Sequence, residues 1–192
     1  MTDNNNTTTT TLNNPSNGSY DSEVWDKPKY AFPKATSESS THSGNCHCGA
    51  IRFRFTISPP LHEYPVICCN CSICARNGAL LVYPNREDFV LERPTAEKQG
   101  VEGGWDKDGE VLGGYSFGDG KVSHRFCKRC GCSPFSTLVP GHWERFMEAM
   151  CEEVRELVPV NVRMITGLDL DALKLKKVDG WKMGTPKYEL KD

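Results

Sequence analysis

Nine of the ten cysteines fall into three tight clusters, and this spacing constrains the fold more than any other feature of the sequence. The clusters are Cys46 and Cys48; Cys68, Cys69, Cys71 and Cys74; and Cys127, Cys130 and Cys132. Cysteines two or three residues apart form disulfides with one another only under strain, whereas their thiolates converge readily on one tetrahedral ion. A disulfide framework is the alternative, but the N-terminus lacks the basic start and apolar stretch of a secretory signal. The spacing therefore predicts metal binding.

The first set of candidate ligands pairs a CxC motif with a distant CxxC motif, each followed by glycine, and comprises Cys46, Cys48, Cys127 and Cys130. Four thiolates form a closed tetrahedral zinc site, and such sites stabilise small folds outright. Because the two motifs lie far apart in the sequence, the ion would join the beginning of the domain to its end. We interpret these four cysteines as the ligands of a structural zinc.

The second set of candidate ligands is the CxCxxC motif of Cys69, Cys71 and Cys74. Three protein ligands and one open position form the arrangement of a catalytic zinc. An exchangeable position suits a thiol substrate, because zinc lowers the pKa of a bound thiol and holds the nucleophilic thiolate at neutral pH. The alternative is a closed site completed by Cys68, Cys132 or a nearby histidine, and the spacing leaves both interpretations open. Redox dithiols of the thioredoxin type belong in a βαβ setting, which this pattern lacks.

Most of the remaining pattern predicts β-strands. Apolar and polar residues alternate from Ile51 to Thr56, which is the period of a half-buried strand. Further strands are expected at residues 66–69, 79–83, 89–91, 111–117, 122–126 and 158–165. Apolar residues at three- and four-residue spacing predict an amphipathic helix over 143–157, and a second short helix is expected from Asp169. We therefore expect a small, mainly β domain with one or two peripheral helices.

The chain divides into a tail and one domain. Residues 1–40 are rich in Asn, Thr, Ser and Gly, so they bury too little apolar surface to offset their ordering entropy, and we expect a disordered low-complexity tail. A zinc-binding domain is expected over residues 43–184, followed by a short tail over 185–192. The Gly- and charge-rich segment 93–114 is a candidate lid or insertion.

The charge balance argues against a nucleic-acid partner. Lys and Arg number 23 against 25 for Asp and Glu, a formal net charge of −2, and the clustered basic face of a nucleic-acid-binding domain is missing. No apolar run approaches the roughly 20 residues of a membrane span. We expect a cytoplasmic protein with neither a nucleic-acid nor a membrane partner. The apolar stripe of residues 143–157 is expected to pack on the sheet, and a homo-oligomer contact through this stripe is the alternative.

The order of the motifs resembles one known family. CHCGAIRF begins at Cys46, CNCSIC at Cys69 and FCKRCGCSPF at Phe126. Together they resemble the glutathione-dependent formaldehyde-activating enzyme (centromere protein V) family over residues 43–180, and the DG pair at Asp179 and Gly180 is similar to the family's ending. The resemblance implies a zinc-stabilised β-tent of twisted antiparallel sheets.

The resemblance also implies two zinc ions per chain and an activity. It places a structural zinc at Cys46, Cys48, Cys127 and Cys130, and a catalytic zinc with an open position at Cys69, Cys71 and Cys74. The implied activity is that of a carbon–sulfur lyase acting on glutathione, or a related thiol, and formaldehyde to form S-hydroxymethylglutathione. A non-catalytic zinc scaffold that binds a protein partner is the alternative. Asn70 and Ala75 depart from the family pattern, which often carries His and a basic residue at these places.

Overall fold

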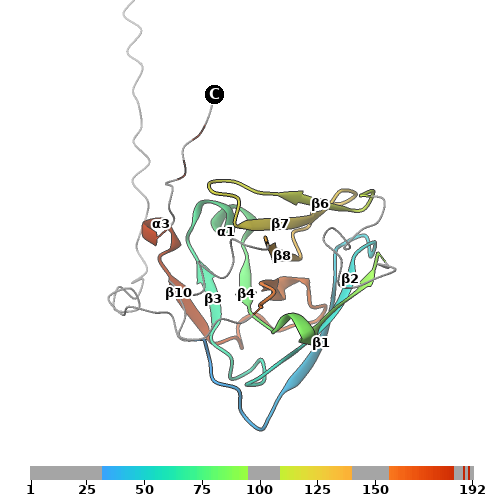
Figure 1. Ribbon diagram of the computed structural model, residues 1–192. Coiled ribbons are helices and arrows are strands. Elements are labelled where there is room, and N and C mark those ends of the chain that lie inside the picture. The colour runs from blue at the N-terminus through green and yellow to red at the C-terminus, as the bar shows by residue number, and fades with distance from the viewer. Residues whose placement is uncertain (1–31, 95–108, 140–155, 184–187, 189, 191–192) are drawn as a thin grey trace, which may run out of the picture.

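The computed structural model describes residues 32–94, 109–139, 156–183, 188 and 190. Within these ranges the chain is mainly β, with two sheets and two short α-helices (Figure 1), so the predicted fold class is confirmed. Most of the predicted helix over 143–157 and most of the 93–114 segment lie outside the described residues; at the described end of the helix, Leu157 forms an isolated β-bridge with Asn85. No helix in the described part of the chain has the length and apolar character needed to cross a membrane.

The smaller sheet carries the first cysteine motif at the end of a hairpin. Its antiparallel strands, in the order β1-β2-β5, are β1 (Ser40–Asn45), β2 (Arg52–Ile57) and β5 (Phe89–Arg93). The β1–β2 pairing runs from Ser40 opposite Ile57 to Asn45 opposite Arg52. The hairpin loop between Asn45 and Arg52 therefore contains Cys46 and Cys48.

The larger sheet has seven strands in the order β10-β3-β4-β9-β8-β7-β6. They are β10 (Leu175–Val178), β3 (Val66–Cys69), β4 (Leu80–Val82), β9 (Val160–Asn161), β8 (Phe135–Leu138), β7 (Val122–Cys127) and β6 (Leu112–Tyr115). All neighbouring strands are antiparallel except β10 and β3, which are parallel. This pair departs from the fully antiparallel sheets that the resemblance implied. Parallel strands need a connection of about a dozen residues or more, and the chain between β3 and β10 is much longer than that.

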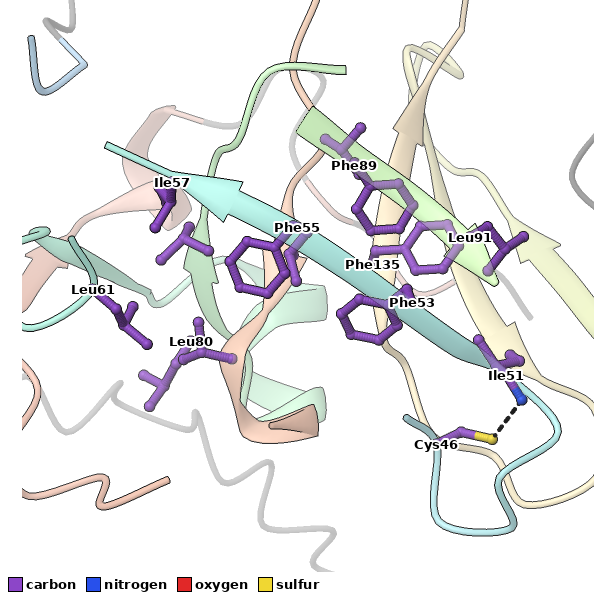
Figure 2. Close-up of a cluster of buried hydrophobic side chains, with 14 of the residues drawn as sticks. Cys46, Ile51, Phe53, Phe55, Ile57, Leu61, Leu80, Phe89, Leu91 and Phe135 are labelled. Carbon is purple, nitrogen blue, oxygen red and sulfur yellow. Dashed lines mark hydrogen bonds between the residues drawn. The ribbon is translucent and has the colours of Figure 1, made fainter. Parts of the chain in front are cut away.

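A cluster of phenylalanines joins the two sheets (Figure 2). The fully buried ring of Phe53, on β2, lies 5.6 Å from that of Phe89 and 6.0 Å from that of Phe135 between ring centroids. Phe89 belongs to β5 and Phe135 to β8, so the cluster buries the inner face of the small sheet against the large one. Cys46 lies at one end of this core, beside Ile51 (Figure 2).

Residues just ahead of β1 bond to the small sheet. The Thr36 amide donates to the Ser58 Oγ at 2.9 Å, and the Ser58 hydroxyl donates to the Glu38 carbonyl at 2.8 Å. Thr36 and Glu38 therefore lie against the end of β2, which closes at Ile57.

Two predicted elements after residue 156 differ in the structure. The strand expected over 158–165 is confined to Val160–Asn161, because a 3₁₀ turn follows at Val162–Met164, where the Asn161 side chain accepts a bond from the Arg163 amide at 3.2 Å. The prediction of a helix from Asp169 is wrong. The Asp169 side chain accepts a bond from the Asp171 amide at 3.0 Å, which closes a turn instead.

Candidate metal centres

The four cysteines of the first predicted set come together. The Sγ atoms of Cys46, Cys48, Cys127 and Cys130 all lie within 4.8 Å of one another, and we call them the four-cysteine group. The Sγ of Cys48 lies 3.6 Å from the Sγ of Cys46 and 3.6 Å from that of Cys127. Zinc–sulfur bonds of about 2.3 Å in a tetrahedron place neighbouring sulfurs about 3.8 Å apart, whereas a disulfide needs about 2.0 Å. The spacing fits a shared ion, and all four thiols are free.

Two tight turns present these thiols. The Gly49 amide donates to the Cys46 carbonyl at 2.9 Å, and the Gly131 amide to the Cys127 carbonyl at 2.8 Å. Both glycines have positive φ, at 70° and 75°, which only glycine adopts without strain. The Ile51 amide also donates to the Cys46 Sγ at 3.2 Å (Figure 2), which stabilises negative charge on this sulfur.

The four thiols differ in proton affinity. Burial raises the pKa of the Cys46 thiol to about 12, whereas the Cys132 amide, which faces the Cys130 sulfur, helps to lower the pKa of Cys130 to about 6. Four thiolates placed this close together, two of them on fully buried residues, repel one another strongly. A divalent cation would compensate this charge, so the donor set fits zinc.

The three cysteines of the second predicted set also come together, on one short loop. The Sγ atoms of Cys69, Cys71 and Cys74 lie within 4.8 Å of one another, and we call them the three-cysteine group. Cys69 ends β3, Cys71 occupies the position just before helix α1 (Ser72–Asn77) without a side-chain capping bond, and Cys74 lies one turn later. Spacing of three residues at the start of a helix places Cys71 and Cys74 on one face.

Interactions within the three-cysteine group favour one thiolate. Bonds from the Cys69 and Cys74 thiols, helped by backbone amides of the first turn of α1, lower the pKa of Cys71 to about 2. The Cys71 sulfur in turn raises the pKa of Cys69 to about 12, and the pKa of Cys74 is raised as well. Ionising all three thiols therefore needs a nearby positive charge.

Within the described residues, no other Cys, His, Asp or Glu joins the three-cysteine group. Cys68 and Cys132, the thiols considered as a fourth ligand, lie outside both groups and pack against the hydrophobic core. The described residues therefore supply three thiols to this group.

The Asp179-Gly180 pair packs directly against the three-cysteine group. Parallel pairing of β10 with β3 places Val178 opposite Cys69, and helix α3 (Gly180–Met183) follows at the same end of the sheet as α1 (Figure 1). A Cβ atom added to Gly180 would lie 2.3 Å from the Cys69 Sγ and 3.0 Å from the Cys71 Cβ. Sequence reasoning identified this pair only by its resemblance to the family, because its neighbour β10 was not predicted.

His124, on β7, is a further titratable side chain of the large sheet. Burial lowers the pKa of His124, and the negative charge of Cys71 opposes this shift. The His124 Nδ1 lies 3.2 Å from the Ser136 Oγ, and its ring stacks on Phe117 with 5.6 Å between ring centroids. From the sequence, His124 ahead of the CxxC motif was interpreted as exposed rather than ligating, whereas the structure half-buries it on β7.

The described part of the chain also has a cavity of about 310 Å³. Its described lining residues include Phe32, Tyr64, Tyr83 and Asp88, and no member of either cysteine group is among them. Within the described residues, this cavity is therefore separate from both candidate metal centres.

Comparisons with known proteins find a matching family model and similar proteins. A model of the family "Glutathione-dependent formaldehyde-activating enzyme" matches residues 41–151, more than half of the chain and a range that contains all seven grouped cysteines. A curated relative, the "Putative glutathione-dependent formaldehyde-activating enzyme" of Halomonas elongata, is 58% identical over 35 residues, which are 18% of this chain and 20% of the relative. The match thus spans about a fifth of that relative's length. A crystal structure of a Rhodobacter sphaeroides protein is similar with a TM-score of 0.46 and 23% identity, over 67% of this chain and 92% of that one.

Proposed function

The chain belongs to the glutathione-dependent formaldehyde-activating enzyme family, and on that premise we propose that it is a zinc-dependent carbon–sulfur lyase. The sulfur of glutathione, or of a related thiol, adds to the carbon of formaldehyde and gives S-hydroxymethylglutathione. A C–S bond forms, the C=O double bond becomes a C–O single bond, and the thiol proton ends on the oxygen. We place this reaction in the cytoplasm, where glutathione is the main thiol. The observation that carries the proposal is the three-cysteine group, which presents three thiols from one loop.

The two cysteine groups support different roles for zinc. Four cysteines can close a tetrahedral site, which suits a structural ion, whereas three leave a position for an exchangeable ligand. When bound at the three-cysteine group, zinc would lower the pKa of the substrate thiol and hold it as a nucleophile.

We assign proton transfer to His124. Burial lowers its pKa, so the imidazole is neutral at pH 7 and can accept a proton. The His124 Nδ1 lies 3.2 Å from the Ser136 Oγ, and in the tautomer that donates this Nδ1 proton to Ser136 the Nε2 lone pair would accept the proton of the thiol. The same nitrogen then returns the proton to the oxygen that formaldehyde contributes.

Two-dimensional exchange NMR of labelled formaldehyde with glutathione tests the proposed activity. We expect exchange to be faster with the zinc-loaded protein than without protein, and Cys71→Ser to reduce it to the rate without protein. Cys68→Ser is the matched control, because this neighbouring thiol belongs to neither group, and it should keep the activity. Equal rates in every sample would contradict formaldehyde activation and favour the zinc scaffold.

Replacing His124 with phenylalanine tests proton transfer. The variant keeps an aromatic ring against Phe117 but loses both ring nitrogens, so we expect slower exchange with an unchanged zinc content. His42→Phe is the control. His42 lies on the small sheet, whereas His124 lies on the large one. His42 also bonds a serine, with its Nε2 2.7 Å from the Ser40 Oγ, and its ring lies beside that of Phe55. Equal loss of activity in both variants would contradict the assignment.

A further inference from the structure

We propose that Asn70 is a positioning residue of the metal centre at the three-cysteine group. Its side chain holds the CxCxxC loop against the segment Val178–Lys182. This inference rests on the zinc assignment of the proposed function. It gives a physical role to a residue that departs from the family pattern, and it extends the metal centre beyond its three thiols.

Asn70 lies between two proposed ligands, Cys69 and Cys71, and bonds to three residues of the C-terminal segment. Its Nδ2 donates to the Asp179 Oδ1 at 2.9 Å, and its Oδ1 accepts from the Trp181 amide at 2.9 Å. Its own backbone amide donates to the Val178 carbonyl at 3.1 Å. One side chain therefore uses both ends of its amide group to hold a segment more than 100 positions away.

The other side of this contact is equally constrained. Asp179 is only 9% exposed. Its Oδ1 also accepts from the Lys182 amide at 3.3 Å, and its Oδ2 lies 3.5 Å from the Lys182 Nζ. The carboxylate thus holds the first turn of α3, and the Asn70 bond orients that turn towards the cysteine loop.

The contact matters to the metal centre because no space separates the two segments. Gly180 lies so close to Cys69 that a side chain would overlap the sulfur. A shift of the segment would therefore move Cys69 and Cys71 relative to Cys74. Residues that orient metal ligands in this way commonly contribute about 10–100-fold to metal affinity.

Asn70→Asp tests the proposal, because it sets a second carboxylate against Asp179. Zinc release from the zinc-loaded protein to a chromogenic chelator should have two phases, with the three-cysteine group releasing first because it has fewer thiolates. We expect Asn70→Asp to accelerate the first phase by about 10–100-fold and to leave the second unchanged. Adding Asp179→Asn to this variant removes the repulsion and should restore much of the slower release.

Asn85→Asp is the matched control, because the Asn85 Nδ2 also donates to an aspartate, Asp88 Oδ2, at 3.0 Å, but Asn85 lies near neither cysteine group. Unchanged release from Asn70→Asp, equal acceleration of both phases, or no rescue by Asp179→Asn would overturn the inference alone. A native protein that binds only one zinc would overturn the metal assignment of the proposed function as well. Both outcomes are read from zinc release and zinc content, and neither depends on catalytic activity.

Discussion

Loss of zinc from the four-cysteine group is expected to unfold the domain, whereas loss from the three-cysteine group is expected to leave it folded. The four-cysteine group joins the β1–β2 hairpin of the small sheet to the end of β7 in the large sheet, so its ion would link the two sheets. Structural zinc sites contribute apparent binding free energies of about 10–16 kcal/mol, as large as the whole unfolding free energy of about 5–15 kcal/mol of most domains. The three-cysteine group draws all its ligands from one loop, so its ion adds no such link.

Cys48→Ser is the sharpest variant for this test, because Cys48 is exposed and its replacement leaves no buried hydroxyl, unlike Cys46 or Cys127. Far-UV circular dichroism should show Cys48→Ser unfolded, or melting far below the native protein, and Cys71→Ser melting close to it. Cys68→Ser serves as the control for loss of a thiol outside both groups. A Cys48→Ser protein that lacks one zinc and melts like the native protein would contradict a structural role for this group.

The two cysteine groups were predictable because most of their information is local. A CxC or CxxC motif brings its thiols together through one turn, and the four ligands of a closed tetrahedral site pair the two distant motifs. The β2 strand was equally clear, because Phe53 and Phe55 alternate with arginines and face the core. Where side chains alternate between two environments, or two ligands share one turn, the sequence pattern and the structure agree.

The surroundings of the second metal centre were not predictable, because they depend on pairing between distant segments. Strand β10 has the sequence LKKV, buries only Val178, and is a strand because β3 pairs with it. Helix α1 has six residues, too few for a periodic pattern and far below the roughly 12–15 that a helix needs to be stable alone. Gly78, which ends the helix in the αL conformation, is a helix-stop signal that can be interpreted only once the helix itself is known. The role proposed for Asn70 depends on β10 and on the residues that follow it, and was therefore invisible in the sequence.

Gly180→Ala is expected to remove zinc from the three-cysteine group while the four-cysteine group keeps its ion. The added methyl group would lie 2.3 Å from the Cys69 Sγ and 3.4 Å from the Cys71 backbone nitrogen, well inside van der Waals contact with the sulfur. Neither side can yield easily, because β10 pairs with β3 beside Cys69 and Asn70 bonds Asp179 in the same segment. The methyl group would thus displace a ligand rather than a flexible side chain.

Gly114→Ala provides the matched comparison. Its added methyl group would also come within 2.9 Å of other atoms, but these are the ends of the Arg125 and Ser123 side chains, which can rotate away. Zinc content measured by atomic absorption should fall from two ions per chain to one in Gly180→Ala and stay at two in Gly114→Ala, with similar melting temperatures. Two tightly held zinc ions in Gly180→Ala would mean that the Cys69 sulfur can move without loss of the ion. The close packing of the Asp179-Gly180 pair would then support the fold alone, and the metal centre would end at its three thiols.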